Sequence, residues 1–210
     1  LRAFFPMSAV NATPRVWSLV NGAELVINGS PTFGAYGLAP YCALTGSGYL
    51  RSPVNANLET TGALTVGLWV SAAAFNTPLV SMWRTSGEGW QLYTDADGLA
   101  NFKVEGGGGS TVYTATSADA MTLDTWTFVV GRYTPSTELA VCVNGVWATN
   151  TTSIPATITD PNERVTVGAL SDGSGTKLTG NVSLAFLCHA ALSDIQVAAL
   201  YGLTRVLFGV

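Results

Sequence analysis

The sequence predicts an all-β protein, either a sandwich or a barrel of short strands, with a single helix near its C-terminal end. Short segments in which apolar and polar residues alternate recur along the chain. Clusters of Gly, Asn, Asp and Pro separate these segments. The 210 residues are 48% hydrophobic, enough for one sizeable core. No fixed repeat or linker divides them, so we expect one domain over residues 1–210.

The strands expected in the first half of the chain are short and bounded by turn residues. Residues 64–70 are the clearest example, because Leu64, Val66 and Leu68 share one face of the segment. The sequence DADG and, after the next strand, the sequence GGGGS indicate a tight turn and a hairpin loop. The strands expected in this half lie at residues 23–28, 64–70, 78–83, 89–94 and 99–104.

The strands expected in the second half include a hairpin with a specific turn. Trp126, Phe128 and Val130 share one face of the strand that precedes it. Asn144-Gly145 is the strongest short-range hairpin signal, because both residues tolerate a positive φ. Further strands are expected at residues 111–115, 138–143, 164–170 and 181–188.

One helix is expected, over residues 193–202. Ser193 and Gln196 have the spacing of a capping box, and Asp194 lies in the first turn. Gly202 lies near the end of the expected helix.

The composition excludes some partners and favours others. Only 10% of the residues are charged, against about 25% in an average soluble domain. Because surface charge keeps protein molecules apart, a chain with so little of it associates more readily. We therefore expect a protein of a large assembly or of the outside of a cell. The net charge is −4 and the nine basic residues are scattered, so no nucleic-acid partner is expected. No apolar run reaches the roughly 18 residues of a membrane span, and the first residues do not read as a signal peptide.

The three cysteines, Cys42, Cys142 and Cys188, are too few for a disulfide framework. They are expected to be small buried apolar residues. The alternative is one bridge between Cys142 and Cys188, if their strands adjoin, with one free thiol.

Several stretches, in their order along the chain, resemble a known family: LTVGLWV, GWQLYTDADGLANFKV, DTWTFVVGRYTPSTELAVCVNGVW, RVTVGAL and LTGNVSLAFLCHAALSDIQVAALY. Together they are similar to the laminin-G-like branch of the concanavalin A-like lectin/glucanase superfamily. The resemblance covers about residues 20–202 and implies a two-sheet antiparallel jelly-roll sandwich that binds ligands at loop rims or on a sheet face. The residues that fall on the family pattern are Trp126, Asn144, Gly145, Gly168, Gly180, Leu192, Ser193, Ile195, Leu200 and Tyr201. Many relatives carry acidic residues after the glycine of the closing strand, whereas GNVSLA has none.

Candidate catalytic groups are scarce. The strands lack the run of alternating carboxylates expected of a glycoside hydrolase. Glu105 and Glu138 are expected at strand ends, where solvation explains them. The only histidine, His189, follows Cys188, but neighbours on a strand point to opposite faces, so the pair is not a catalytic dyad. We therefore expect no enzyme, with Cys188 in the core and His189 in solvent.

Two kinds of binding site remain open. Asp95 and Asp97, or the acidic loop at residues 160–163, could hold calcium, although Gly106 stands where an EF-hand needs glutamate. The alternative for Asp95-Ala96-Asp97-Gly98 is a tight turn. Among the six tryptophans, Trp83 and Trp90 flank a loop and could form an exposed platform for sugar rings, the alternative being that they fill the core.

The two apolar ends of the chain, residues 1–7 and 202–210, have two interpretations. They could pair as edge strands and close the sandwich, or they could dock against another subunit.

From these features we expect a non-catalytic structural or adhesive module of a particle surface, on a virion or otherwise extracellular. A bacteriophage capsid-decoration or fibre protein would fit. Its partners would be copies of itself, capsid or tail proteins, and cell-surface glycans. The alternative function is a secreted carbohydrate-binding module, and a glycoside hydrolase is a distant third. No cofactor is expected apart from the calcium ion considered above.

Overall fold

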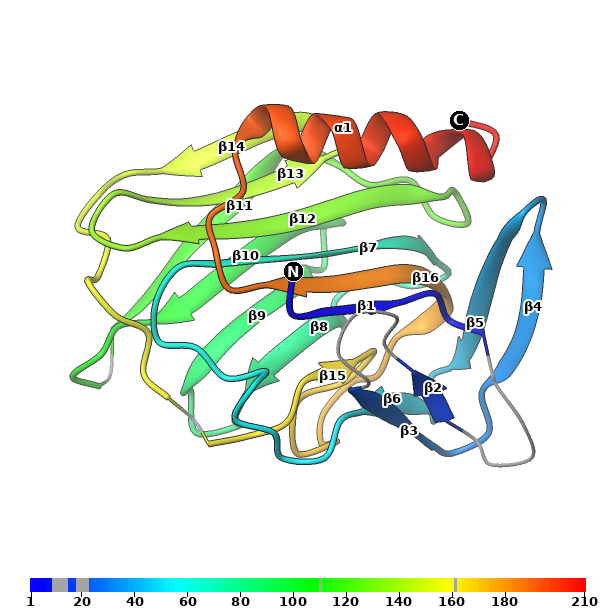
Figure 1. Cartoon of the computed structure of the whole chain (residues 1–210), viewed down its shortest axis with the longest axis horizontal. Coiled ribbons are helices and arrows are strands. Elements are labelled where there is room, and N and C mark those ends of the chain that lie inside the picture. Colours follow the sequence, from blue (N-terminus) through cyan, green and yellow to red (C-terminus); the bar gives the residue numbers. More distant parts are fainter. Residues whose placement is uncertain (9–14, 18–22, 110, 161) are drawn as a thin grey trace.

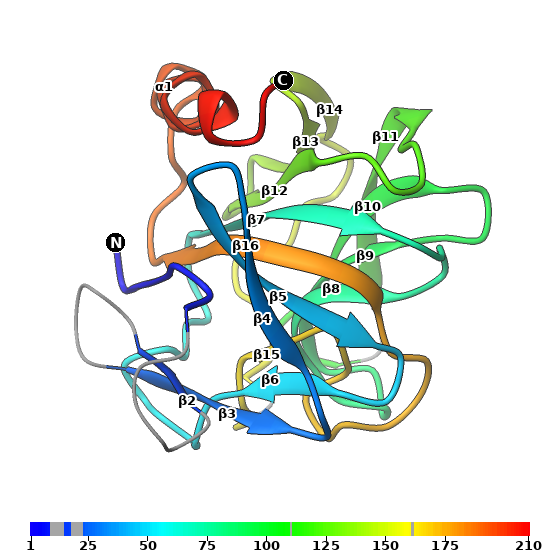
Figure 2. The same cartoon turned by 90° about the vertical axis from the view of Figure 1, so that its right-hand side faces the viewer.

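The protein is a sandwich of two antiparallel sheets, with one helix packed on the outside (Figure 1). The computed structural model describes residues 1–8, 15–17, 23–109, 111–160 and 162–210. Seen from the side, the two sheets lie face to face and the helix forms a third, partial layer (Figure 2). The expected jelly-roll fold with a short C-terminal helix is confirmed.

The first sheet carries the helix on its outer face. β1 and β5 both pair with β16, each along a different part of it. In spatial order the sheet contains β14 (Val146–Asn150), β13 (Glu138–Val143), β12 (Thr127–Thr134), β7 (Leu64–Ala72), β16 (Thr179–Cys188), β5 (Ala39–Thr45) and β4 (Thr32–Tyr36), with β1 (Ala3–Phe5) beside β16.

The second sheet faces the first across the core, and its outer face is not covered by a helix. The strand expected at residues 164–170 is reduced to two residues in this sheet. In spatial order it contains β11 (Val112–Ala120), β10 (Leu99–Glu105), β9 (Gly89–Thr94), β8 (Pro78–Trp83), β15 (Thr166–Val167), β6 (Tyr49–Arg51), β3 (Glu24–Asn28) and β2 (Arg15–Trp17).

The main core lies between the sheets and follows the alternation of the strands. Leu64, Val66 and Leu68 point into it from β7, as the period of that segment predicts. The layers are close where Phe102 of β10 meets Gly131 of β12. A Cβ at Gly131 would lie under 3.0 Å from the Phe102 ring, so this position accepts only glycine without rearrangement.

A second apolar cluster lies between the first sheet and the helix. α1 (Asp194–Thr204) begins at Ser193 with the expected capping box to Gln196, and it continues into the 3₁₀ turn η1 (Arg205–Leu207). Trp126, Phe128 and Trp69 point toward this layer. Phe128 and Trp69 pack against Tyr201 of α1, and Trp126 packs against Phe208, which follows η1. Trp69, which points to the outer face of β7, is thus buried under the helix.

β16 changes faces in its middle. Val182 points into the main core, but Leu184 has a φ of 47° and interrupts the pairing with β7. After this bulge Ala185 and Leu187 point into the main core, while Leu184 and Phe186 point toward the helix. Strict alternation along residues 181–188 would place Val182, Leu184, Phe186 and Cys188 on one face, and the bulge breaks that alternation.

The two ends of the chain are fixed in different ways: the N-terminal end pairs as a strand, as expected, whereas the C-terminal end does not. The N-terminal end forms β1 and pairs with β16. The C-terminal end continues the helix into η1 and buries Phe208, whose ring centroid lies 4.3 Å from that of Trp69. Each end is thus fixed separately to the first sheet.

All three cysteines are buried and free, so the alternative of a Cys142–Cys188 bridge is wrong. Burial raises the pKa of Cys42 to about 12 and that of Cys142 to about 11, as expected of thiols that serve as apolar core residues. No helix within the described ranges is long and apolar enough to cross a membrane.

Candidate functional site

A groove of about 320 Å³ lies on the outer face of the second sheet. Its floor comes from β9 and β10, and one side is formed by the end of β8 and the loop after residue 169. The side chains that matter for its chemistry are Trp83, Thr85, Gln91, Tyr93, Lys103 and Leu170.

The alternation of β9 and β10 creates the floor. Trp90 and Leu92 of β9 point into the core, so Gln91 and Tyr93 point outward. The same holds for β10, where Phe102 and Val104 are core residues and Lys103 lies between them. Lys103 is the direct cross-strand neighbour of Gln91.

The ammonium group of Lys103 lies against two aromatic rings. Its Nζ is 4.0 Å from the ring centroid of Trp83 and 5.0 Å from that of Tyr93, which are cation–π distances. On β9, the residue paired with Trp83 is Gly89, which has no side chain. Burial lowers the pKa of Lys103. No carboxylate of the described residues forms an ion pair with it.

The floor of the groove holds polar groups that the protein itself leaves unused. The side chains of Gln91, Tyr93 and Lys103 make no hydrogen bond to the part of the chain that the structure describes, although Gln91 is buried. Asn101, one row further along β10, is different. Its side-chain amide donates to Asp95 Oδ2 at 3.0 Å and accepts from Thr116 at 2.6 Å, so both its donor and its acceptor already have partners within the protein. Unused donors and acceptors in a hollow are what a polar ligand requires.

One wall of the groove is a loop held firmly on the sheet. Ser81 Oγ donates to the carbonyl of Ala169 at 2.7 Å. Ser171 Oγ donates to the carbonyl of Trp83 at 2.6 Å. These buried bonds fix the segment that carries Leu170 and Thr176 into the groove. The wall is therefore built before any ligand arrives.

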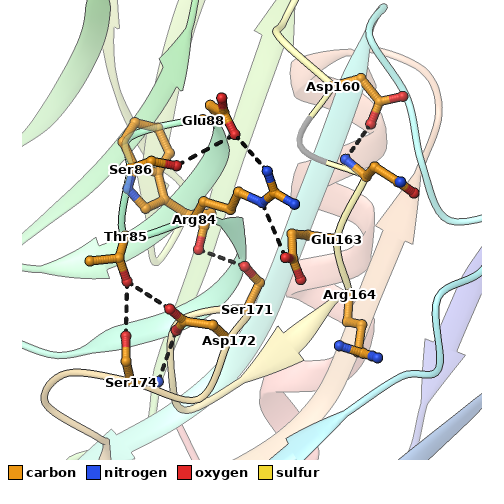
Figure 3. A network of polar contacts seen from close by, with 12 residues as sticks. Arg84, Thr85, Ser86, Glu88, Asp160, Glu163, Arg164, Ser171, Asp172 and Ser174 are labelled. Atoms are coloured by element: carbon orange, nitrogen blue, oxygen red, sulfur yellow. Dashed lines mark hydrogen bonds and ion pairs between the residues drawn. The ribbon is translucent and has the colours of Figure 1, made fainter.

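A polar network forms the rim next to Trp83 (Figure 3). Arg84 pairs with Glu88 at 3.2 Å and with Glu163 at 3.1 Å. Thr85, which also lines the groove, donates to Asp172 at 2.7 Å and lies 2.9 Å from the hydroxyl of Ser174. The network joins the β8–β9 turn to the loops around residues 163 and 172. It orders the rim.

The two tryptophans singled out from the sequence differ in their positions. Trp83 lines the groove, but only 6% of it is exposed, because the loop covers one part and Lys103 another. Trp90 is fully buried in the main core, so the expectation that it forms an exposed platform is wrong. The alternation Trp90–Leu92 already carried that information, since both are apolar residues of one face.

The residues singled out for calcium are engaged in turn structure. Asp95 Oδ1 accepts from the backbone of Asp97 at 3.1 Å and of Leu99 at 2.9 Å, the arrangement of the tight turn. In the acidic loop, Asp160 accepts from the backbone of Asn162 at 2.9 Å. Within the described ranges no group of three or more His, Cys, Asp or Glu residues could hold a metal ion. Calcium binding at Asp95 and Asp97 stays a prediction without a built site.

Two further expectations are corrected by burial. Glu105 is buried rather than solvated. His189 is half-buried, and its Nε2 has no hydrogen-bond partner among the described residues. Burial lowers the pKa of His189. Glu138 does lie at a strand end, where it pairs with Arg132 at 2.7 Å.

A family model described as the concanavalin A-like lectin/glucanases superfamily matches residues 44–198. No curated protein matches the chain in sequence. Several solved structures share its fold at low identity. The binding domain of Paraclostridial Mosquitocidal Protein 1 has a TM-score of 0.76 at 12% identity, over 96% of this chain and 51% of that one. The botulinum neurotoxin serotype G binding domain has a TM-score of 0.75 at 10% identity, over 97% and 51%.

A third structure matches over nearly its whole length. Domain 4 of AbnA, an extracellular arabinanase from Geobacillus stearothermophilus, was solved in complex with arabinotriose. It has a TM-score of 0.73 at 18% identity, over 96% of this chain and 98% of that domain. The present chain thus spans about half the length of the two toxin binding domains and nearly all of the arabinanase domain.

Proposed function

Because the chain belongs to the concanavalin A-like lectin/glucanases superfamily, we propose that it is a non-catalytic carbohydrate-binding module. The ligand lies in the groove over β8, β9 and β10. One observation carries the proposal: Gln91, Tyr93 and Lys103 line a groove beside Trp83, and their polar groups have no hydrogen-bond partner among the described residues.

The chemistry of the floor suits a sugar. Hydroxyl groups both donate and accept hydrogen bonds, and the floor offers both capacities. The ammonium of Lys103 donates, the hydroxyl of Tyr93 does either, and the amide of Gln91 does both. The carbon face of a sugar ring packs on an aromatic ring, and Tyr93, which is only partly buried, supplies one in the groove. The arabinotriose bound by the AbnA domain is an oligosaccharide, which supports this choice of ligand class.

The absence of a carboxylate pair in the groove supports a binding role without hydrolysis. No Asp or Glu is among the described residues that line it. Glycoside hydrolysis generally needs two carboxyl groups about 5 to 9.5 Å apart around the scissile bond. Glu88 and Glu163, at the nearby rim, are both paired with Arg84.

The setting in which the module works stays a proposal. Its low charge favours the outside of a cell or of a particle, and the bacteriophage surface role expected from the composition is one such setting. The groove would serve either setting, since a virion adhesin and a secreted module both meet glycans.

Binding to an array of oligosaccharides, followed by calorimetry on the best ligand, tests this function. Tyr93→Phe and Gln91→Ala each remove polar groups from the floor while leaving the core intact. Each variant should bind about five- to tenfold more weakly, the effect of about one lost hydrogen bond. Tyr36→Phe, on an exposed tyrosine of β4 in the other sheet, is the matched control and should bind normally.

The same ligand should be recovered intact after prolonged incubation, with no new reducing ends. Release of reducing ends would contradict the non-catalytic role. Equal binding by Tyr93→Phe, Gln91→Ala and the unchanged chain would place the ligand elsewhere.

A further inference from the structure

The outward face of α1 is apolar and uncovered. The helix packs on the first sheet through Val197, with Leu200 and Tyr201 partly buried. On the opposite side Ile195 is 82% exposed and Leu203 74%, and Val206 in η1 is 70% exposed. Figures 1 and 2 show α1 as the outermost element on this side of the first sheet. A surface helix normally presents polar residues to solvent, so this face is typical of a covered one.

The apolar residues form a continuous stripe. At about 100° per residue, positions 195, 199, 202 and 206 follow one line along the helix. Two of these are the small residues Ala199 and Gly202, both exposed. Small residues between larger ones leave a shallow depression in the middle of the stripe. A second helix can approach closely there.

We propose that a second copy of this chain covers the stripe. The two copies of α1 would run antiparallel across a two-fold axis between Ala199 and Leu200. An isologous contact of this kind brings the same patch together from both subunits.

Charge complementarity selects this occupant and this register. Asp194 and Arg205 lie eleven positions apart, which places them on the same flank of the stripe. In an antiparallel pair with a two-fold axis, equal flanks meet, and residue 194 lies opposite residue 205. Asp194, although bonded to Arg132 at 2.6 Å, has 67% of its side chain exposed, and Arg205 is exposed. The dimer therefore forms the pair between Asp194 and Arg205 of the partner subunit twice.

The ends of the stripe extend the contact beyond one helix. An 11-residue helix is about 16 Å long, and alone it falls short of the roughly 800 Å² that a standard interface buries on each partner. At the C-terminal end, Leu38 of the β4–β5 turn is 85% exposed, and its neighbour Gly37 approaches the carbonyl of Leu207. At the N-terminal end lies a hollow of about 600 Å³, bordered by Ala191, Leu192 and Ile195 and by the polar residues Arg132, Thr134, Glu138, Ser193 and Asp194. The antiparallel arrangement places the projecting end of each copy at the hollow end of the other.

This interface leaves the groove free. α1 covers the outer face of the first sheet, whereas the groove lies on the outer face of the second sheet. The dimer proposal is thus independent of the carbohydrate proposal, and either can fail alone.

Cysteine cross-linking tests the register. Near the two-fold axis, residue 199 of one copy lies about one residue rise from residue 199 of the other, whereas residue 195 lies about 14 Å along the axis from its own copy. Ala199→Cys should therefore form a disulfide-linked dimer under mild oxidation, and Ile195→Cys should not. Equal cross-linking of both variants, or of neither, would overturn the register.

Sedimentation velocity of the whole chain over a range of concentrations tests the dimer itself. The unchanged chain should sediment as a dimer, and Leu203→Glu as a monomer. The control Val112→Glu changes an exposed valine on β11, in the other sheet, and should remain dimeric. Arg205→Asp should weaken the dimer, and adding Asp194→Arg should restore it. A monomer at all concentrations, or failure of the double variant to regain the dimer, would refute the proposal. Circular dichroism of each variant confirms that it is folded.

Discussion

Lys103 is the residue whose position says most about the groove. A half-buried ammonium without a carboxylate partner among the described residues is unfavourable, and the two aromatic rings offset only part of that cost. The result is a pKa below the ordinary value of 10.5 for lysine. A ligand oxygen that accepts from Lys103 would stabilise the charged form. A ligand oxygen would therefore supply the hydrogen-bond acceptor that the Lys103 ammonium lacks among the described residues.

The protonation of Lys103 predicts how binding depends on pH. The ammonium exists below its pKa, and burial lowers that pKa, so the charge is lost before pH 10.5 is reached. The pKa of Tyr93 is raised above 10.0 by burial and by the charge of Asp95, so its hydroxyl keeps its proton longer. We expect the affinity for the glycan to fall as the pH rises toward 10.5, measured by calorimetry across a pH series.

Variants separate this effect from alkaline unfolding. Lys103→Met should bind weakly at every pH, and Lys103→Arg should keep its charge and lose the alkaline fall. An affinity that stays constant up to pH 10.5 in the unchanged chain would argue against a role for the ammonium.

The sequence singled out Trp83, which lines the groove but is 6% exposed and not an open platform, and it did not single out the neighbours of Trp83 there. Trp83 and Lys103 are on strands separated by β9, and their contact depends on the register of three strands, which pairs Trp83 with Gly89 and Lys103 with Gln91. Register of this kind is fixed by long-range pairing and is not written in either segment alone. The burial of Trp90 has a local cause. Trp90 shares a face of β9 with Leu92, and this alternation places it in the core even though it lies next to a loop.

Among the elements, those fixed by local signals were predicted well. The capping box at Ser193 and the Asn144-Gly145 turn appear as expected, because a few neighbouring residues determine them. The bulge at Leu184 could not be predicted. A leucine with a φ of 47° has no sequence signal, and the surrounding pairing of β16 imposes it.

The Asn144-Gly145 turn supports more than its own hairpin. Asn144 has a φ of 50°, and its side-chain oxygen accepts from the backbone N–H of Phe128 at 2.9 Å. Asn144→Ala removes this acceptor and disfavours the positive φ, so the free energy of unfolding should fall by about 1–2 kcal/mol in urea denaturation. Asn144→Asp keeps an acceptor and tolerates the conformation, so it should lose less. Equal losses in both variants would show that neither feature matters.

At the scale of the whole molecule, the distance between the two sheets depends on which residues meet across the core, and no single segment of the sequence reveals these residue pairs. Gly131 of β12 and Phe102 of β10 belong to different sheets and meet across the core. The sequence predicted the sandwich, because alternation is local. It could not predict which glycine lies opposite which ring, nor that the loop after Gly168 would wall a groove, because both depend on how distant segments pack.

Gly131→Ala tests this close approach. The new methyl group would clash with the Phe102 ring, and overpacking of this kind costs about 1–3 kcal/mol in the free energy of unfolding. Adding Phe102→Leu should recover part of the loss, which thermal and urea denaturation would both register. Gly62→Ala is the control, since the nearest atom to its added Cβ would lie 3.8 Å away. A loss in the control as large as in Gly131→Ala would assign the effect to the backbone instead.

The place of β16 in the first sheet has a consequence for how the chain matures on the ribosome. Both flanking neighbours, β7 on one edge and β5 with β1 on the other, are synthesised well before residues 179–188. Until that segment emerges from the ribosome, no strand joins the two halves of the sheet, and the edges of β7 and β5 lack their hydrogen-bonding partner. Closure is therefore a late, long-range event, of the kind that makes β-rich domains slow to fold and dependent on protection from aggregation meanwhile.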